Sequence, residues 1–230
     1  MTVGEMIYSI VKLQLMLCKS QIIKLHKLFE HRIIPINLIS SADAYIDVSN
    51  GWLSLAQSTI PRAVKLVSGN FHVKSLILSK DALETLSRAE NLLWRLPTFH
   101  NLTHIGVDQG MYDFTGEALV DILEKSPNLE VLDIVDGFDP DFCSDGEAWT
   151  LRSVPRCLKS SLKLASISDF RGGEAEMQFL SFLLKNAVDL TRIKIFCEDC
   201  LSADLKKQAD INSQLQVKRK GLASCAIELR

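Results

Sequence analysis

The chain has 230 residues, of which 47% are hydrophobic and 23% are charged, as in an ordinary globular protein. A chain of this length buries enough surface to fold without a disulfide framework or a structural metal, so we expect no cofactor. Its formal net charge of −2 excludes the basic balance that is typical of general nucleic-acid binders. We therefore expect no nucleic-acid partner.

The N-terminal apolar stretch does not predict a membrane segment or an export signal. Met6–Cys18 is interrupted by Lys12 and Gln14, and it is shorter than the roughly 20 residues that a spanning helix needs. It also lacks the basic start and the cleavage site of a signal peptide. The six cysteines have no framework spacing, which indicates reduced thiols. We expect an intracellular protein, in the cytoplasm or the nucleus, without a membrane partner.

Residues 1–40 are predicted to form a helical segment. Apolar residues follow one another at alternating steps of three and four, as on one face of a helix: Val11, Leu15, Cys18, Ile22, Leu25 and Phe29. Such a segment could cap the exposed end of a repeat stack, dock a partner helix, or form an extension without fixed order.

The rest of the chain contains a repeat. Five hexapeptides are apolar at their first, fourth and sixth positions, and they begin at Val73, Leu102, Leu129, Leu162 and Leu190. A degenerate copy begins at Asp43. Leucine-rich repeats have a period of about 20–29 residues and a short strand of the form LxxLxL in each copy. The pattern therefore predicts one strand for each repeat.

Helical periodicity follows several of these strands. Residues 81–96, 115–126 and 174–187 each carry an apolar stripe with a period near 3.6, and prolines follow the first two. A unit of strand, loop and helix cannot bury both of its apolar faces alone, whereas stacked units can. We predict an α/β fold: a leucine-rich-repeat solenoid with a curved parallel sheet and helices on its outer face.

One interval is rich in acidic residues and replaces most of the expected helix. It contains Asp136, Asp139, Asp141, Asp145 and Glu147. A calcium loop of the EF-hand type would need Asp or Asn and then Gly at the fifth and sixth positions, where this chain has Cys143 and Ser144. The interval is therefore expected to be a solvated acidic loop.

Side chains alternate along a strand, so the residues that flank the inward positions should project from the other face of the sheet. Leu132, Ile134, Ile193 and Ile195 are expected to point inward. The outward row is predicted to contain Ser75, Ile77, His104, Gly106, Val131, Asp133, Leu164, Ser166, Arg192 and Lys194. Partners usually bind the concave face of a solenoid, so His104, Asp133, Arg192 and Lys194 are the candidate partner-binding residues.

Cys197 and Cys200 form a CxxC pair after the last full hexapeptide. Structural zinc would need a second pair of ligands, and a redox role would need the motif to open a helix after a strand. A redox or zinc-binding protein is the alternative hypothesis. The sequence has no phosphate-binding loop and no hydrolase or metalloprotease motif, so we expect no enzyme activity and no catalytic residue.

The stretch from Trp149 to Ala187 resembles the FBD domain of plant F-box/leucine-rich-repeat proteins. The matching residues are Trp149, Val154, Pro155, Cys157, Leu158, Ser160, Leu162, Lys163, Ile167, Phe170, Gly172, Glu174, Glu176, Phe182, Leu183, Leu184, Lys185, Asn186 and Ala187. A polar helix over residues 205–220 and a terminal strand over residues 224–229 also fit. The resemblance implies leucine-rich repeats over residues 41–152 and an FBD region over residues 153–230 that continues the stack.

The resemblance also implies a function. It implies a non-catalytic module that binds another protein, as the substrate-recognition part of an SCF-type ubiquitin ligase. An F-box would carry a leucine-proline start and a Ser-x-Leu-x-x-x-Trp element, and both are missing from Met1–Ser40. We therefore do not expect this chain to bind a Skp-type adaptor.

Overall fold

The computed structural model describes residues 21–24, 43–47, 59–108, 116–138, 154–219 and 225–230. These residues form an 8-stranded sheet in which strand order follows chain order, and all neighbouring strands are parallel. The strands are β1 (Gln21–Lys24), β2 (Asp43–Asp47), β3 (Ser75–Ser79), β4 (His104–Asp108), β5 (Val131–Ile134), β6 (Leu164–Phe170), β7 (Arg192–Cys197) and β8 (Ala226–Leu229).

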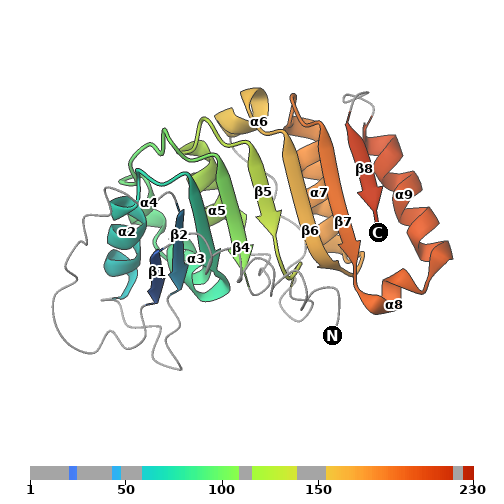
Figure 1. Cartoon of the computed structure of the whole chain (residues 1–230), viewed down its shortest axis with the longest axis horizontal. Helices are drawn as coiled ribbons and strands as arrows, with labels where there is room; N and C mark the ends of the chain where they lie inside the picture. Colours follow the sequence, from blue (N-terminus) through green and yellow to red (C-terminus); the bar gives the residue numbers. More distant parts are fainter. Residues whose placement is uncertain (1–20, 25–42, 48–58, 109–115, 139–153, 220–224) are drawn as a thin grey trace.

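Helices connect the strands. They are α2 (Thr59–Gly69), α3 (Lys80–Ser87), α4 (Glu90–Leu93), α5 (Gly116–Glu124), α6 (Arg156–Ser160), α7 (Glu174–Asn186), α8 (Asp199–Ser202) and α9 (Leu205–Lys218). Helices α3, α5 and α7 lie behind the sheet in Figure 1. The predicted α/β class, with a parallel sheet and helices packed on it, is confirmed. None of the helices in the described ranges is long and apolar enough to cross a membrane.

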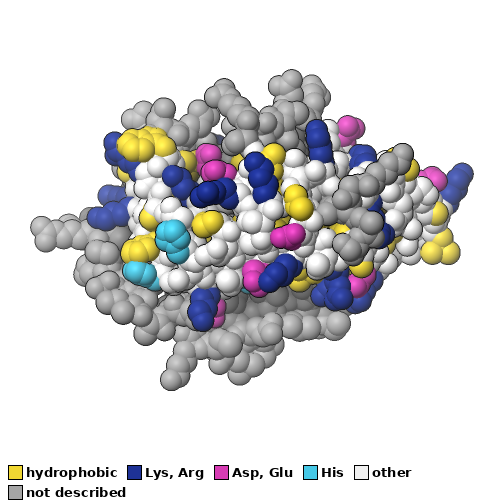
Figure 2. All heavy atoms as spheres, turned by 90° about the horizontal axis from the view of Figure 1, so that it is seen from above, with side chains coloured by type: hydrophobic (Ala, Val, Ile, Leu, Met, Phe, Trp, Pro, Cys, Tyr) yellow, Lys and Arg dark blue, Asp and Glu magenta, His cyan; other side chains and the backbone are white. Residues whose placement is uncertain are grey.

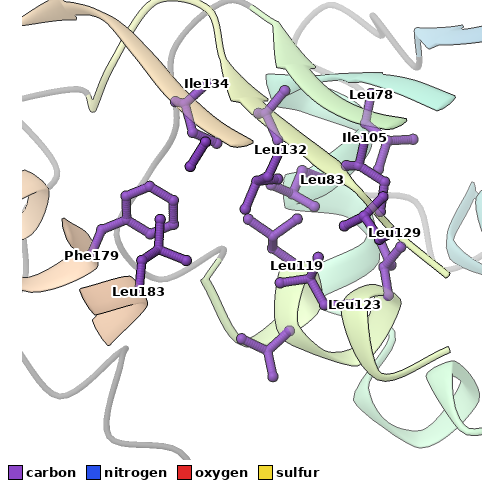
Figure 3. Close-up of a cluster of buried hydrophobic side chains, with 14 of the residues drawn as sticks. Leu78, Leu83, Ile105, Leu119, Leu123, Leu129, Leu132, Ile134, Phe179 and Leu183 are labelled. Atoms are coloured by element: carbon purple, nitrogen blue, oxygen red, sulfur yellow. The ribbon is translucent and has the colours of Figure 1, made fainter. Parts of the chain in front are cut away.

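The core lies between the sheet and these helices. Leu132 of β5 faces Leu119 and Leu123 of α5, whereas Ile134 lies nearer Phe179 of α7 (Figure 3), and the side chains of Leu119, Leu123, Leu132 and Ile134 are fully buried. Ile193 and Ile195 of β7 are buried in the same way, so the predicted inward positions are confirmed. The first residue of each full hexapeptide precedes its strand and is also buried, which anchors the turn into the strand: Val73, Leu102, Leu129, Leu162 and Leu190.

Two predicted elements differ from the structure. The predicted helix over residues 81–96 is interrupted. Helix α3 ends at Ser87 with Arg88 as its C-cap, and α4 begins at Glu90 after Ala89. In the predicted N-terminal helix, the four residues Gln21–Lys24 form strand β1. β1 pairs with β2, and Ile22 and Ile23 are β-branched, so the helical prediction is wrong for these four residues. The rest of the 1–40 segment lies outside the described residues.

A buried carboxylate joins the turns at the lower edge of the sheet in Figure 1. Glu176, in the first turn of α7, accepts hydrogen bonds from the backbone nitrogens of Arg171 at 3.0 Å and Gly173 at 2.9 Å. Gly137, which follows β5, has a φ of +61°, and a Cβ there would lie 3.0 Å from Glu176 Oε1. The turn after β5 and the turn after β6 therefore pack on one carboxylate.

Candidate binding face of the sheet

The face of the sheet opposite α3, α5 and α7 carries the predicted outward residues. We call it the open face and define it by two registered rows of Cα partners. One row contains Asp43, Ser75, His104, Val131, Leu164, Arg192 and Ala226, and the other contains Tyr45, Ile77, Gly106, Asp133, Ser166, Lys194 and Glu228. The parallel register therefore places all four candidate residues on one face, in strands β4, β5 and β7.

His104 and Asp133 contact each other directly. His104 Nε2 donates to Asp133 Oδ2 over 2.8 Å, and Ser75 Oγ lies 3.2 Å from His104 Nδ1. Ser166 donates to the other oxygen of Asp133. Since a carboxylate only accepts, the Nε2 atom carries the proton, and in the neutral imidazole Nδ1 accepts from the Ser75 hydroxyl. Four successive strands, β3 to β6, are thereby linked by one chain of polar contacts.

Arg192 and Lys194 lie on β7, the strand next to the last one in this set of polar contacts. Arg192 Nε contacts Glu228 Oε1 at 3.2 Å, and Glu228 also binds Arg230 over 2.7 Å. Lys194 lies between Ser166 and Glu228 in the register. Glu228 was not among the candidate residues, although the alternation of Ala226 and Glu228 in the terminal strand is the signal that could have found it. The β7 and β8 end of the open face is therefore a partly neutralised basic site.

The other end of the open face is partly covered by one of its own side chains. The Tyr45 hydroxyl of β2 donates to Asp108 Oδ2 of β4 over 2.8 Å. Adjacent strands lie about 4.8 Å apart, so the Tyr45 ring must cross β3 to make this bond. Ile77, at the centre of β3, is buried although it lies on the open face. Ile77 therefore lies on the predicted face of the sheet but is buried there, and the Tyr45 side chain of the neighbouring strand reaches across β3.

The trio Ser75, His104 and Asp133 has the residue types of a hydrolase triad, but the strands that carry it offer no uncommitted backbone donor for acyl transfer. A triad requires backbone donors aimed at the developing oxyanion. Here the backbone amides of β3, β4 and β5 around the trio are committed to the parallel ladder, and Asp133 is also held by Ser166. Within these three strands the arrangement fixes side-chain orientation and offers polar contacts to a ligand.

The CxxC pair is split between two environments. Cys197 ends β7 and is buried, and burial raises its pKa. Cys200 lies in α8, is exposed and donates to Glu198 Oε2 over 3.1 Å, and this hydrogen bond raises the pKa of the Cys200 thiol. A redox pair needs a thiol whose pKa is lowered, which is the opposite shift. Among the described residues, no group of three His, Cys, Asp or Glu side chains is placed to hold a metal ion.

The described residues that carry the FBD resemblance have structural roles. Cys157 of α6 is buried, donates through Sγ to the Leu123 carbonyl of α5 over 3.4 Å, and has a pKa that burial raises to about 12. Gly172 has a φ of +71°, and a Cβ there would lie 2.6 Å from Ile211 Cδ1 of α9. Phe170 is fully buried at the end of β6. These residues fix the packing of α6, α7 and α9 on the sheet.

Comparisons with known proteins show which family the chain resembles. The FBD family model matches residues 151–195. An F-box/FBD/LRR-repeat protein of Arabidopsis thaliana is 34% identical over 143 residues, which cover 60% of this chain and 28% of that protein. An F-box/LRR-repeat protein of the same plant is 30% identical over 168 residues, which cover 68% of this chain and 33% of that protein. No solved structure matches the chain.

A third relative also has FBD in its name. An FBD-associated F-box protein of Arabidopsis thaliana is 36% identical over 98 residues, which cover 43% of this chain and 20% of that protein. The chain thus spans about a third or less of the length of these three relatives. The family resemblance predicted from the sequence is confirmed: the chain is related to the FBD-containing F-box/leucine-rich-repeat proteins of plants.

Proposed function

We propose that this chain is a leucine-rich-repeat solenoid that continues into an FBD region and binds another protein through its open face. In this proposal the repeats occupy residues 41–152 and the FBD region occupies residues 153–230. The observation that carries it is that His104, Asp133, Arg192 and Lys194 lie on one face of the parallel sheet, in strands β4, β5 and β7. Repeat proteins commonly bind partners through such an extended sheet surface.

The chemistry of the open face supports a partner with charges of both signs. Asp133 and His104 are each about one-third exposed, and they are held by neighbours on both sides, so little conformational entropy is lost when a partner binds them. Arg192 and Lys194 provide positive charge at the β7 end of the same face. An acidic group of the partner would meet this end, and a donor group would meet Asp133.

The names of the relatives support a finer proposal. They are F-box proteins, and the chain acts in this proposal as the substrate-recognition part of an SCF-type ubiquitin ligase. The two F-box elements are missing from Met1–Ser40, so we expect the 230-residue chain to recognise the substrate without binding a Skp-type adaptor itself. Calorimetry with purified adaptor tests this expectation, and micromolar or tighter binding would contradict it.

The open face is tested by charge reversal. A partner is first captured from plant extract, and its affinity is then measured at low salt for the unmodified chain and for Arg192→Glu with Lys194→Glu. The matched control is Lys65→Glu with Lys206→Glu, which makes the same charge change at exposed positions on helices α2 and α9. We expect the first pair to change affinity and the control pair to leave it nearly unchanged. Equal affinity for all three chains would remove the β7 end from the binding site.

A further inference from the structure

The two ends of the strands differ in charge: basic residues predominate where the strands begin, and acidic residues are the more numerous where they end, although Lys80, Arg171, Lys206 and Lys207 also lie there. Figure 1 shows the strands running downward. We call the side of the sheet where the strands begin the upper edge and the side where they end the lower edge. The turns at the upper edge carry the basic residues Lys74, Arg88, Arg95, Lys125, Arg156, Lys159 and Lys163. The turns and first helical residues at the lower edge carry the acidic residues Asp47, Asp81, Asp108, Asp136, Asp169, Glu174, Glu198, Asp199 and Asp204.

Helix dipoles account for part of this separation. The helices run antiparallel to the strands, so their C-terminal ends lie at the upper edge, where positive side chains are favoured. Glu124, Glu130 and Asp189 are exceptions at this edge, and Glu130 is paired with Lys163 at 2.7 Å. The dipole does not explain why large apolar side chains lie exposed at the same edge.

Exposed aromatic side chains mark one end of the upper edge. Trp94, just after α4, is 67% exposed, and Phe71, in the turn after α2, is 38% exposed. The Arg95 guanidinium lies 5.1 Å from the centre of the Trp94 ring, and the His72 ring lies 3.5 Å from that of Phe71. Figure 2, which looks onto this edge, shows hydrophobic, His and basic side chains gathered at the end that carries α2.

Hydrogen bonds between neighbouring turns hold these residues in place. Asn101 donates to the His72 carbonyl over 3.4 Å, and Lys125 Nζ donates to the Trp94 carbonyl over 3.4 Å. Helix α4 also contacts both α2 and α5. The aromatic rings are therefore presented on turns that are linked to one another, which lowers the entropy that binding would cost.

We infer that this edge is a second docking surface, formed by Phe71, His72, Trp94, Arg95, His100 and Lys125, for an acidic protein segment that carries a bulky apolar residue. Exposed Trp and Arg side chains are the types that dominate protein-binding hot spots. The apolar residue would pack on Trp94 and Phe71, and the acidic residues would face Arg95 and Lys125. This surface is separate from the open face, so a negative binding result here would not contradict the proposed function.

A nucleic-acid strand is the competing occupant, because it also combines negative charge with flat rings. The charge of the whole molecule disfavours it. A polyanion would be repelled by the acidic lower edge and by the net charge of −2, whereas a short acidic segment extends only over the basic turns.

Fluorescence anisotropy with labelled probes tests the surface. The probes are a short peptide with one central Phe flanked by Glu, the same peptide with Gly for Phe, and a short single-stranded oligothymidylate. The variants are Trp94→Ala and Arg95→Glu. Their controls on α9 are Leu205→Ala, at a position that is 76% exposed, and Lys206→Glu.

We expect the Phe peptide to bind more tightly than the Gly peptide, and Trp94→Ala to weaken it by about tenfold, as loss of an aromatic hot spot does. Arg95→Glu should also weaken it, most strongly at low salt, while both control variants bind as the unmodified chain does. Because Arg95→Glu keeps the Trp94 side chain, it tests the surface even if Trp94→Ala perturbs folding. Equal loss in the variants and their controls, no binding of the Phe peptide, or binding of oligothymidylate alone would overturn the inference.

Discussion

The carboxylate of Glu176 accepts a hydrogen bond of 2.9 Å from the backbone nitrogen of Gly173 while only 2% of the residue is exposed. Burial raises the pKa of Glu176, although the backbone N–H groups of Gly173 and Arg171 act in the opposite direction. The native state therefore holds a proton on this carboxyl more tightly than the unfolded chain does. This relationship gives the fold a pH dependence that can be measured.

The free energy of unfolding should report the titration of Glu176. Its stability contribution falls as the pH rises from the ordinary carboxyl value of 4.5 through the raised native pKa. Glu176→Gln has no such titration, so the unfolding free energy of the unmodified chain minus that of this variant should fall as the pH rises through that window. Urea unfolding over a series of pH values measures it. Glu174→Gln, at an exposed neighbouring position, is the control and should leave the pH profile unchanged. If this signed difference stays constant or rises with pH, the assignment is contradicted.

The core position of Leu132 predicts a large loss of stability on truncation. The Leu132 side chain of β5 is fully buried against α5. Leu132→Ala should lower the free energy of unfolding by about 2–5 kcal/mol because it leaves a cavity. Val131→Ala changes the adjacent residue, which is half-buried on the open face, and should cost clearly less. Chemical denaturation of both variants measures the difference. A loss near zero for Leu132→Ala would show that the strand register is wrong.

The glycine at position 137 is required by backbone conformation as well as by space. Gly137→Ala would place a side chain at a φ of +61° and bring its Cβ to 3.0 Å from the carbonyl oxygens of Ser168 and Asp169. The left-handed conformation alone costs a non-glycine residue about 1–2 kcal/mol, so thermal unfolding should occur at a lower temperature. Gly69→Ala is the matched control, since nothing lies within 4 Å of its Cβ position. This control should be neutral or slightly stabilising.

Thiol reactivity should rank the cysteines by exposure and pKa. Among the four described cysteines, Cys200 is exposed while Cys157, Cys197 and Cys225 are buried. Iodoacetamide at neutral pH should therefore label Cys200 first, and slowly, because its hydrogen bond to Glu198 raises the thiol pKa.

The contact with Glu198 can be tested in the same assay. Glu198→Gln removes the carboxylate and should speed labelling of Cys200, while Asp189→Asn, at the other edge of the sheet, should not. Peptide mapping by mass spectrometry gives the rates. Rapid labelling of both Cys197 and Cys200 in the unmodified chain would instead favour the redox alternative.

Regular spacing made much of the fold predictable. Each LxxLxL hexapeptide fixes which residues of a strand are apolar, and the strict period of two decides which face each residue occupies. That is why the inward positions of β5 and β7 and the shared face of His104, Asp133, Arg192 and Lys194 follow from the sequence. The helix over residues 174–187 was also predicted closely, since Glu174–Asn186 carries a clear apolar stripe.

Local patterns failed where distant side chains decide the outcome. The apolar stripe over residues 11–29 predicted a helix, yet Gln21–Lys24 form a strand because β2 offers an edge to pair with. Ile77 is buried by Tyr45, which comes from another strand, and the partner of Arg192 is Glu228, 36 positions further along the chain. No local period contains that information.

The sequence by itself determined the repeat, the strand in each full hexapeptide, and the face on which each residue of those strands lies, because these depend on a period of two and on the spacing of the copies. Only the tertiary structure decided which side chains meet across strands: His104 with Asp133, Arg192 with Glu228, and Glu176 with the turns after β5 and β6. It also gathered Trp94, Phe71 and basic residues at one edge. The physical reason is that these contacts depend on registration between parallel strands and on burial, which are set when the repeats stack.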